Sequence, residues 1–218
     1  MASKGDIPKR LATCKVPMCT ACLFGEATRQ PWRTKAAANK IKIHQIKKPG
    51  DCVHVDQIES TTPGLVGQMK GFLTIKRYRC ATVFVDHFSG LSYIHVQKST
   101  NAEETLQGKR QFEAYCATYG VRVQHYHADN GRFAENQFIN DVAVCGQTIS
   151  YCGVNAHFQN GIAEKRIRDV QDLARTMMIH ARHQWPNAIA ANLWPYALKM
   201  ANDVHMSTPS LKTVGAPS

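Results

Sequence analysis

Three acidic residues have types and neighbours that suit a metal-dependent reaction. Asp129 lies in the stretch HADNG, and Glu164 follows 35 positions later in the stretch QNGIAE. Asp56 lies earlier, in the stretch CVHVDQ. Carboxylate oxygens are the hard ligands that Mg²⁺ and Mn²⁺ prefer, and phosphoryl transfer uses such ions to activate the nucleophile and stabilise the leaving oxygen. If the fold brings the three carboxylates together, they form a site for this chemistry.

Local sequence patterns place each acid on or beside a secondary-structure element. Residues 121–126 alternate apolar and polar side chains as in a half-buried strand, so Asp129 follows the C-terminal end of that strand. Residues 52–57 alternate in the same way, which puts Asp56 on another strand. Glu164 follows an Asn-Gly turn and opens an amphipathic helix. The apolar stripe of this helix consists of Ala163, Ile167, Val170, Ala174, Met177 and Ala181.

The intervening residues predict further strands and helices. Short stretches rich in β-branched and aromatic residues predict an antiparallel meander with the Asp56 strand at one end. A helix is expected from Ala102 to Tyr119, where Gly120 ends it. The other expected strands are 71–75, 80–86, 91–96 and 148–151, and the other expected helices are 135–145 and one or two between 185 and 205.

Four sequence blocks resemble the integrases of copia-type long-terminal-repeat retrotransposons, which are relatives of retroviral integrases. The blocks are HVD at 54–56, FVDHFSGLSYIHVQKS at 84–99, HADNG at 127–131 and QNGIAEKRIRDVQDLARTMM at 159–178. In that family three acids form the Asp, Asp-35-Glu triad of a ribonuclease-H-like catalytic core, and 34 residues separate Asp129 from Glu164 here. The resemblance covers nearly the whole chain and implies a fragment of a polyprotein.

The resemblance implies an α/β, ribonuclease-H-like fold, with a mixed five-stranded sheet flanked by helices and a small cysteine-containing N-terminal extension. The expected element order, βββαβαβα, agrees with this fold. The resemblance also implies that Asp56, Asp129 and Glu164 are catalytic residues and ligands of Mg²⁺ or Mn²⁺. The implied activity is metal-dependent 3′-end processing and strand transfer of retrotransposon DNA into target DNA by a homo-oligomer.

Two residues of the predicted helix resemble positions that family members use to contact DNA. Asn130 and Asn160 flank the two later acids and could contact DNA as well, although turn chemistry alone explains both. On the predicted helix, Arg168 lies one turn from Glu164 and Gln171 about two turns, on the same side. Lys165 and Arg166 are expected to be solvated neighbours that contribute positive charge. The expected DNA contacts are Asn130, Asn160, Lys165, Arg168 and Gln171.

Cysteines near the N-terminus predict part of a zinc-binding segment. Cys19 and Cys22 have the spacing of half a zinc knuckle, and Cys14 lies nearby. In the resembling family a preceding pair of histidines completes the zinc domain, whereas no histidine precedes Cys14 here. Either the chain is a fragment of a longer polyprotein, or Cys14 and a residue such as His44 complete the Zn²⁺ site. We interpret the segment as an incomplete knuckle that binds zinc weakly or not at all.

The chain is expected to divide into four segments. They are a partial zinc-binding segment at 1–30, a basic linker at 31–50, the catalytic core at 51–183 and a C-terminal helical extension of the core at 184–218. Proline, glycine and lysine residues mark the linker, which has little to bury. A hydrophobic content of 44% is enough for one main domain with a smaller appendage.

Positive charge is concentrated at the N-terminus. The formal net charge is +11, and residues 1–50 contribute +9 of it, with 11 Lys and Arg against two acidic residues. Such a segment binds a polyphosphate through counterion release, which gives affinity without sequence preference. We therefore favour contact with nucleic acid over the alternative of a solvated basic arm that only maintains solubility.

Cysteine content and hydropathy indicate the compartment. Eight cysteines in 218 residues do not make the dense framework of a small secreted domain, so a reducing, intracellular environment is expected. The first residues lack the apolar core of a secretory signal, and no stretch approaches the roughly 18 apolar residues of a membrane span. The resemblance implies a cytoplasmic particle and the nucleus as locations, and no membrane partner.

Two alternative functions stay open. The first is an inactive nucleic-acid-binding remnant of a mobile element: the intact acids argue against it, whereas the missing half of the zinc site and the lack of a C-terminal DNA-binding domain argue for it. The second is a ribonuclease-H-type nuclease, which shares the fold and the metals but needs a further acid. Asp86 is another candidate acid, but its place at a strand end in the meander favours a structural role. A Cys-His hydrolase is excluded, because no cysteine lies in a nucleophile-like motif.

Overall fold

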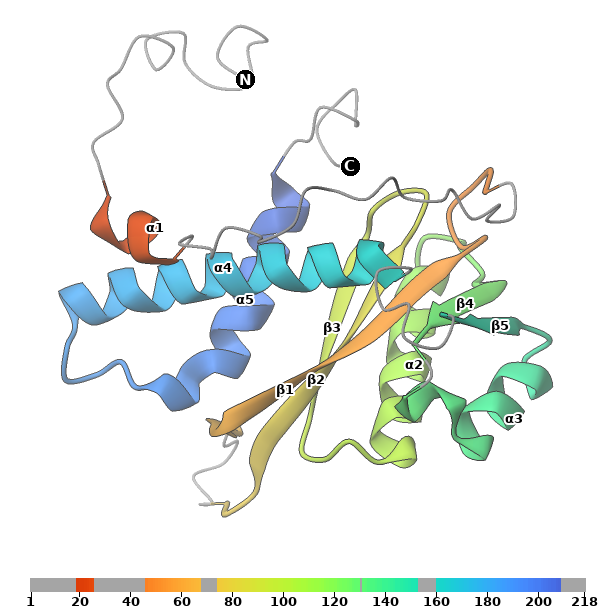
Figure 1. Ribbon diagram of the computed structural model, residues 1–218, viewed down its shortest axis with the longest axis horizontal. Helices are drawn as coiled ribbons and strands as arrows, with labels where there is room; N and C mark the ends of the chain where they lie inside the picture. The colour runs from red at the N-terminus through yellow and green to blue at the C-terminus, as the bar shows by residue number, and fades with distance from the viewer. Residues whose placement is uncertain (1–18, 26–45, 68–73, 130, 153–159, 209–218) are drawn as a thin grey trace, which may run out of the picture.

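The computed structural model describes residues 19–25, 46–67, 74–129, 131–152 and 160–208. Five strands form one mixed sheet in the order β3-β2-β1-β4-β5, with β1 at its centre (Figure 1). The strands are β1 (Val53–Leu65), β2 (Arg77–Asp86), β3 (Ser92–Gln97), β4 (His125–Ala128) and β5 (Thr148–Tyr151). The helices are α1 (Thr20–Gly25), α2 (Ala102–Ala117), α3 (Asn136–Val144), α4 (Gly161–Gln184) and α5 (Trp194–Ser207), with short 3-10 helices η3 (Arg132–Ala134) and η5 (Ala191–Leu193).

The central strand β1 has an antiparallel neighbour, β2, on one side and a parallel neighbour, β4, on the other. Its pairing with β2 is regular from Val53 to Glu59 and resumes at Gly64. Across this interruption β1 advances from residue 59 to 64 while β2 moves only from Cys80 to Tyr78, so the extra residues of β1 form a bulge. The part of β1 that carries Asp56 therefore lies wholly within the regular pairing.

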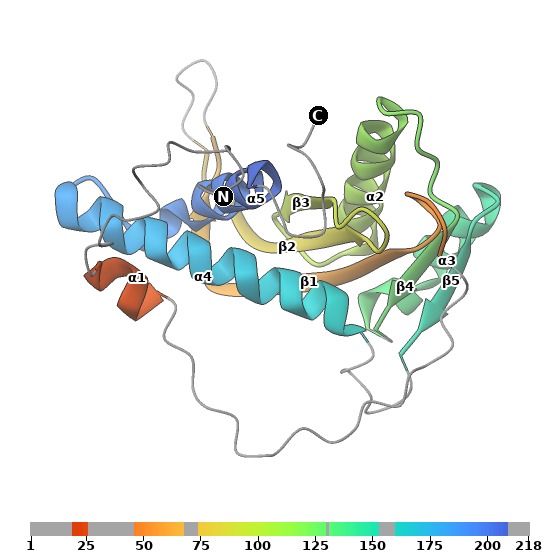
Figure 2. The ribbon, with the colours of Figure 1, turned by 90° about the horizontal axis from the view of Figure 1, so that it is seen from above.

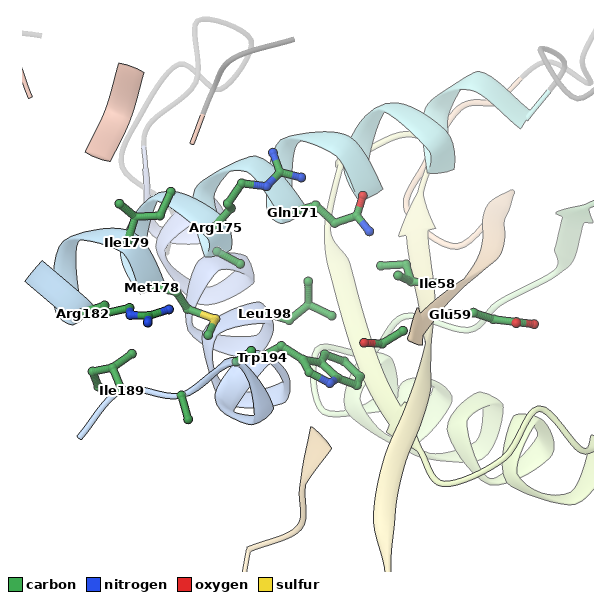
Figure 3. A pocket seen from close by; sticks show the side chains of 14 residues that line it. Ile58, Glu59, Gln171, Arg175, Met178, Ile179, Arg182, Ile189, Trp194 and Leu198 are labelled. Atoms are coloured by element: carbon green, nitrogen blue, oxygen red, sulfur yellow. The ribbon is translucent and has the colours of Figure 1, made fainter. Parts of the chain in front are cut away.

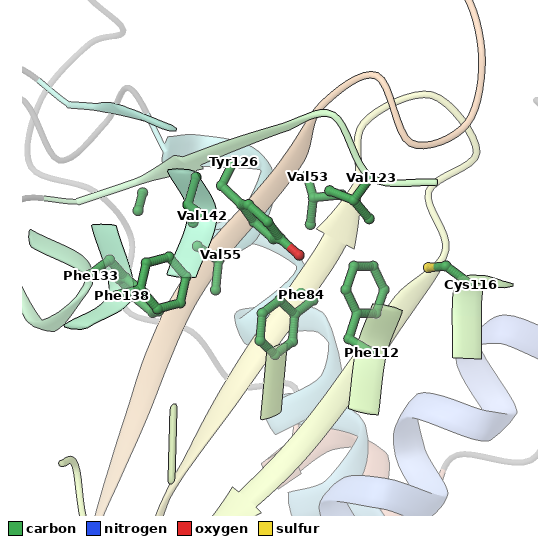
Figure 4. Packing of buried hydrophobic residues seen from close by; sticks show 11 residues of the cluster. Val53, Val55, Phe84, Phe112, Cys116, Val123, Tyr126, Phe133, Phe138 and Val142 are labelled. Carbon is green, nitrogen blue, oxygen red and sulfur yellow. The ribbon is translucent and has the colours of Figure 1, made fainter. Parts of the chain in front are cut away.

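Helices cover both faces of the sheet, because side chains along each strand point alternately to opposite sides. On one face Phe84 packs with Phe112 of α2 and Phe138 of α3 in an aromatic cluster (Figure 4). On the other face Val83 packs with Val170 of α4 and with residues of α5. Figure 2 shows α2 and α4 on opposite sides of the strands. The sheet is thus a middle layer whose central strands are buried on both sides.

The N-terminal helix α1 packs against α4 (Figure 1). Arg175 Nη1 donates a hydrogen bond of 2.9 Å to the carbonyl oxygen of Gly25, the last residue of α1. A side chain at Gly25 would collide with Thr176, so only glycine permits this close approach. The cysteine-containing extension therefore contacts the core directly.

The predicted mixed five-stranded sheet flanked by helices is confirmed, with local differences. The strand expected at 71–75 is wrong in part: Thr74 and Ile75 belong to no strand, and 71–73 lie outside the described residues. Strand β4 begins four residues later than expected, because the N–H of Val121 bonds instead to the Cys116 carbonyl at the end of α2. None of the described helices combines the length and the apolar character needed to cross a bilayer.

A buried lysine joins α2 to α3. Lys109 Nζ lies 2.8 Å from Asp141 Oδ2 and 3.1 Å from Glu113 Oε1, and the lysine side chain is fully buried. The ammonium group also lies 5.7 Å from the centroid of the Tyr126 ring. Burial acts to lower the pKa of Lys109, but the hydrogen bond to Asp141 and the charge of Glu113 outweigh burial and raise it. Lys109 therefore stays charged, and the ion pairs with its two carboxylate partners offset the cost of removing the ammonium group from water.

Replacing Lys109 with methionine is expected to lower the free energy of unfolding by about 3 kcal/mol, because mostly buried carboxylates lose their counter-charge. The control is Arg110, which pairs with the same Asp141 at 2.8 Å but has a side chain that is 67% exposed. Arg110→Met should cost much less, because solvent screens an exposed ion pair. Urea unfolding of both variants measures the difference, and equal losses would show that burial of the lysine adds nothing to the ion pair.

Candidate active site

Asp56 and Asp129 come together through the parallel pairing of β1 and β4. The register pairs Val55 with Ala128, so the next residue of each chain segment, Asp56 and Asp129, follows at the same level of the sheet. Both aspartates line one pocket of about 490 Å³. The other lining residues are Gln57, Glu59, Gly131, Arg132, Phe133 and Glu135. Two hard carboxylates therefore line the same cavity.

Glu164 lies in the first turn of α4, and its charge acts on the same part of the structure as the two aspartates. The thiol of Cys152, directly after β5, provides the evidence. Burial raises the pKa of this thiol, and the negative charges of Asp129, Glu164 and Asp56 raise it further. All three acids thus lie close enough to Cys152 to act on it electrostatically.

The three carboxylates are neighbours without being tightly packed. Asp56 Oδ1 accepts a hydrogen bond of 2.8 Å from the backbone N–H of Gln57, and Asp129 Oδ1 accepts one of 3.1 Å from Gly131. Their ligand atoms and those of Glu164 are not all within 4.8 Å of one another. Like charges repel at short range, so a cation is needed to draw these oxygens into one coordination shell.

Asn160, the residue before α4, holds the start of this helix against β1. Its Nδ2 donates a hydrogen bond of 3.0 Å to the carbonyl oxygen of Val55, and its Oδ1 lies 3.3 Å from His54 Nδ1. Asn160 is 1% exposed in this structure, and its expected contact with DNA stays a prediction. Its amide positions Glu164 relative to Asp56.

His54 is a buried residue of the site that sequence reasoning did not single out. It lies two residues before Asp56, so alternation along β1 puts both on the same face of the sheet. Burial is the main cause that lowers the pKa of His54 to about 4, and the nearby charges of His127 and His87 contribute to the same shift. His54 is therefore neutral at physiological pH. The available signal was its position two residues before a candidate catalytic acid.

The predicted DNA contacts on α4 have different surroundings. Lys165 and Arg168 are exposed, as expected for residues that meet a polyanion. Arg166 was expected to be solvated, and this is wrong: its guanidinium donates hydrogen bonds to the carbonyl of Gly90 at 2.9 Å and to Ser92 Oγ at 3.1 Å. Arg166 therefore ties α4 to the turn between β2 and β3. The remaining candidate, residue 130, lies outside the described residues.

Gln171 lines a second pocket, of about 360 Å³, between β1, α4 and α5 (Figure 3). Most of the labelled walls are apolar or aromatic, including Met178 and Trp194, so Gln171 lies beside an apolar cavity rather than in the pocket of Asp56. Trp194 Nε1 donates a hydrogen bond of 2.9 Å to the Thr62 carbonyl, which agrees with the expected packing role of aromatics in this region. Glu59 lines both pockets.

Only part of the predicted zinc-binding cysteines can be placed. Cys14 lies outside the described residues. The backbone N–H of Cys22 and the Cys22 thiol both hydrogen-bond to the thiol of Cys19, which lowers the pKa of Cys19. A thiol with a lowered pKa is more readily deprotonated and is then a better metal ligand. Because Cys14 cannot be placed, zinc binding by this segment stays a prediction.

Comparisons with known proteins bear on these assignments. No family model matches the sequence. A retrovirus-related Pol polyprotein from transposon RE2 of Arabidopsis thaliana is 22% identical over 209 residues, which cover 91% of this chain and 12% of that polyprotein. The chain therefore spans about an eighth of the length of this curated relative.

Two solved structures share the fold. The catalytic core domain of HTLV-2 integrase, in complex with magnesium, superposes with a TM-score of 0.52 at 18% identity, over 77% of this chain and 93% of that one. The simian T-cell lymphotropic virus intasome superposes with a TM-score of 0.54 at 16% identity, over 83% of this chain and 58% of that one. The predicted ribonuclease-H-like fold is confirmed, and the chain is similar to a retrotransposon polyprotein in sequence and to retroviral integrase cores in fold.

Replacing Asp129 with asparagine is expected to lower the pKa of Cys152, because it removes the largest electrostatic cause of the raised value. The ¹³Cβ chemical shift of Cys152, followed against pH in labelled protein, measures this pKa. Asp172→Asn is the matched control, since Asp172 pairs with Arg175 further along α4 and should not affect the thiol. If both variants leave the pKa unchanged, the acids do not surround Cys152.

Proposed function

We propose that this chain is the catalytic core of a retrotransposon integrase, which processes the 3′ ends of element DNA and joins them to target DNA. The observation that carries the proposal is the arrangement of Asp56 and Asp129 at one level of two parallel strands, with Glu164 on the adjoining helix near the same thiol. The sequence similarity to a retrotransposon polyprotein supports the choice of element.

The donor set of the site fits Mg²⁺ or Mn²⁺. Asp56, Asp129 and Glu164 offer only carboxylate oxygens, and these ions prefer hard oxygen ligands. When bound, the ions activate the attacking water or 3′-hydroxyl and stabilise the leaving oxygen. The magnesium complex of the HTLV-2 integrase core supports the same kind of ion here.

The remaining residues bind and orient rather than react. Lys165 and Arg168 are exposed close to Glu164 on α4, so their charges suit backbone phosphates of element DNA. Arg132 lines the pocket of the acids and is half-exposed, which gives it access to the same polyanion. Asn160 orients the helix on which Glu164 lies, through its bond to β1.

The assembly and location follow from the same proposal. A relative in fold is solved as an intasome, which supports DNA as the partner and a homo-oligomer as the working form. We place the protein in a cytoplasmic particle and in the nucleus, where integration into host DNA requires it.

A ribonuclease-H-type nuclease is the second candidate, because two further acids line the pocket of Asp56 and Asp129. Glu59 is exposed there, and Glu135 lies 3.6 Å from Arg132. Either carboxylate could serve as the additional acid that such nucleases need. Cleavage of an RNA–DNA hybrid distinguishes this activity from DNA strand transfer.

Asp129→Asn and Glu164→Gln are each expected to reduce Mg²⁺- or Mn²⁺-dependent strand transfer of element-end DNA to background. DNA affinity and melting temperature should change little, because removing one of several like charges relieves repulsion. A gel assay of joined products measures activity, fluorescence anisotropy measures DNA affinity, and Asp172→Asn is the control that should stay active.

Three outcomes separate the candidate functions. Loss of strand transfer in the two acid variants alone supports the integrase. Cleavage of an RNA–DNA hybrid without strand transfer by the unmodified chain supports the nuclease. If the unmodified chain binds DNA but performs neither reaction with Mg²⁺ or Mn²⁺, the inactive remnant is the correct interpretation.

The basic linker is expected to contribute salt-dependent DNA affinity. Deleting residues 1–50 would also remove α1 from α4, so substitution is the sharper change. Replacing Lys35, Lys40 and Lys42 with glutamine should flatten the slope of log affinity against log salt by up to roughly 2.7, since each DNA phosphate that a lysine neutralises adds about 0.9 to the slope. The matched control replaces the exposed lysines Lys76, Lys98 and Lys199. Equal slopes in both triple variants would mean that the linker does not bind DNA.

A further inference from the structure

A cluster of softer metal ligands lies next to the carboxylate site. The Sγ atom of Cys52 is 3.9 Å from His54 Nε2, and His54 Nε2 is 2.9 Å from His87 Nδ1. The three donor atoms all lie within 4.8 Å of one another, and among the described residues no other three His, Cys, Asp or Glu side chains reach this spacing. Cys52 is 3% and His54 1% exposed, whereas His87 is only partly buried and gives the cluster access to solvent.

These separations fit a tetrahedral ion. With Zn–N near 2.0–2.1 Å and Zn–S near 2.3 Å, tetrahedral angles put two ligand nitrogens about 3.3 Å apart and a sulfur and a nitrogen about 3.6 Å apart. The observed 2.9 and 3.9 Å differ from these values by a few tenths of an ångström. Small side-chain adjustments are enough to reach coordination geometry.

The hydrogen bonds around His54 leave its Nε2 atom free of a proton and able to bind a metal ion. Asn160 Nδ2 donates to the carbonyl of Val55, which fixes the orientation of the amide and turns Oδ1 toward His54 Nδ1. Nδ1 must therefore carry the proton and donate it, so Nε2 presents a lone pair to Cys52 and His87. A metal-binding histidine commonly donates its other N–H to an oxygen in this way.

The backbone around the cluster is held by several hydrogen bonds. The backbone N–H of His87 donates to the Cys52 carbonyl at 2.9 Å, which joins the turn after β2 to the start of β1. The buried carboxylate of Asp86 accepts from Gly50 at 2.8 Å and from the N–H and hydroxyl of Ser89 at 2.7 and 2.6 Å. The structural role expected for Asp86 therefore includes fixing the turn that carries His87.

We propose that Cys52, His54 and His87 bind a Zn²⁺ ion that fastens the start of β1 to the turn after β2, close to Asp56 on the same strand. A thiolate and two imidazoles are ligands for Zn²⁺ rather than for Mg²⁺, so this site and the carboxylates select different metals. The fourth position is taken by water entering on the side of His87. The ion stiffens the segment that carries Asp56.

The test uses the full chain in a background of Cys14→Ser, Cys19→Ser and Cys22→Ser, which removes the N-terminal cysteines as competing ligands. Zn²⁺ bound per chain is measured after equilibrium dialysis, and Co²⁺ replaces Zn²⁺ to give a sulfur-to-cobalt charge-transfer band. The test variants are Cys52→Ser and His87→Gln. The controls are Cys80→Ser, a buried thiol outside the cluster, and Asp129→Asn in the carboxylate site.

The expected result is one Zn²⁺ per chain and a cobalt–thiolate band in the background protein and in both controls. Cys52→Ser should abolish the band, and His87→Gln should weaken binding at least tenfold. Zn²⁺ should raise the melting temperature of the background protein and of the controls, but not of the test variants. With a chelator present, all the proteins should melt cooperatively, which shows that the variants are folded.

Three results would overturn the proposal. No zinc binding by the background protein would mean that the cluster is a metal-free pair of hydrogen-bonded histidines beside a thiol. Zinc retained by both Cys52→Ser and His87→Gln would place the ion elsewhere. Zinc lost in Asp129→Asn would assign it to the carboxylates. The zinc readouts do not depend on strand transfer. If the chain binds Zn²⁺ at Cys52 but shows no strand transfer, the zinc proposal holds and only the integrase proposal is contradicted.

Discussion

The hydrogen bonds of the Asn160 amide hold the start of α4 against the central strand. One end of the amide donates to the Val55 carbonyl at 3.0 Å, and the other faces His54. Since Asp56 follows Val55 and Glu164 lies one turn into α4, this bridge sets the separation of two acids that are 108 positions apart in the chain. The amide is buried, so no water replaces these partners when they are removed, and the polar groups left behind would be unsatisfied.

The two faces of the sheet are stabilised in different ways. The face covered by α2 and α3 is mainly aromatic, with Phe84 and Phe112 stacked at a centroid distance of 4.9 Å. The face covered by α4 becomes polar toward the start of the helix, where His54 and His127 lie with ring centroids 5.2 Å apart. Apolar packing tolerates small changes of shape, whereas buried polar groups require defined partners. The positions of side chains are therefore most tightly constrained on the α4 face near His54 and His127.

The sequence was sufficient for the features that depend on neighbouring residues. Alternation placed Asp56 on a strand and Asp129 after one, and an Asn-Gly turn placed Glu164 at the start of a helix, as the structure has them. The level at which Asp56 meets Asp129 depends on the β1–β4 register, which joins segments more than 70 residues apart. Without the family resemblance, local patterns would have left these acids as ordinary turn and helix-start residues. Arg166 and Gln171 show the limit of helical periodicity, because their surroundings come from the β2–β3 turn and from α5.

The bulge in β1 gives the sheet two mechanically different halves. From Val53 to Glu59 the strand is paired with β2 at every residue, and near its start also with β4, so a displacement there would strain two ladders at once. Beyond Glu59 the extra residues interrupt the ladder with β2, and Trp194 Nε1 donates a hydrogen bond of 2.9 Å to the Thr62 carbonyl within this bulge. The position of Asp56 is therefore set by the two ladders of the regular segment and does not depend on the separate pairing of residues 64 and 65 with β2.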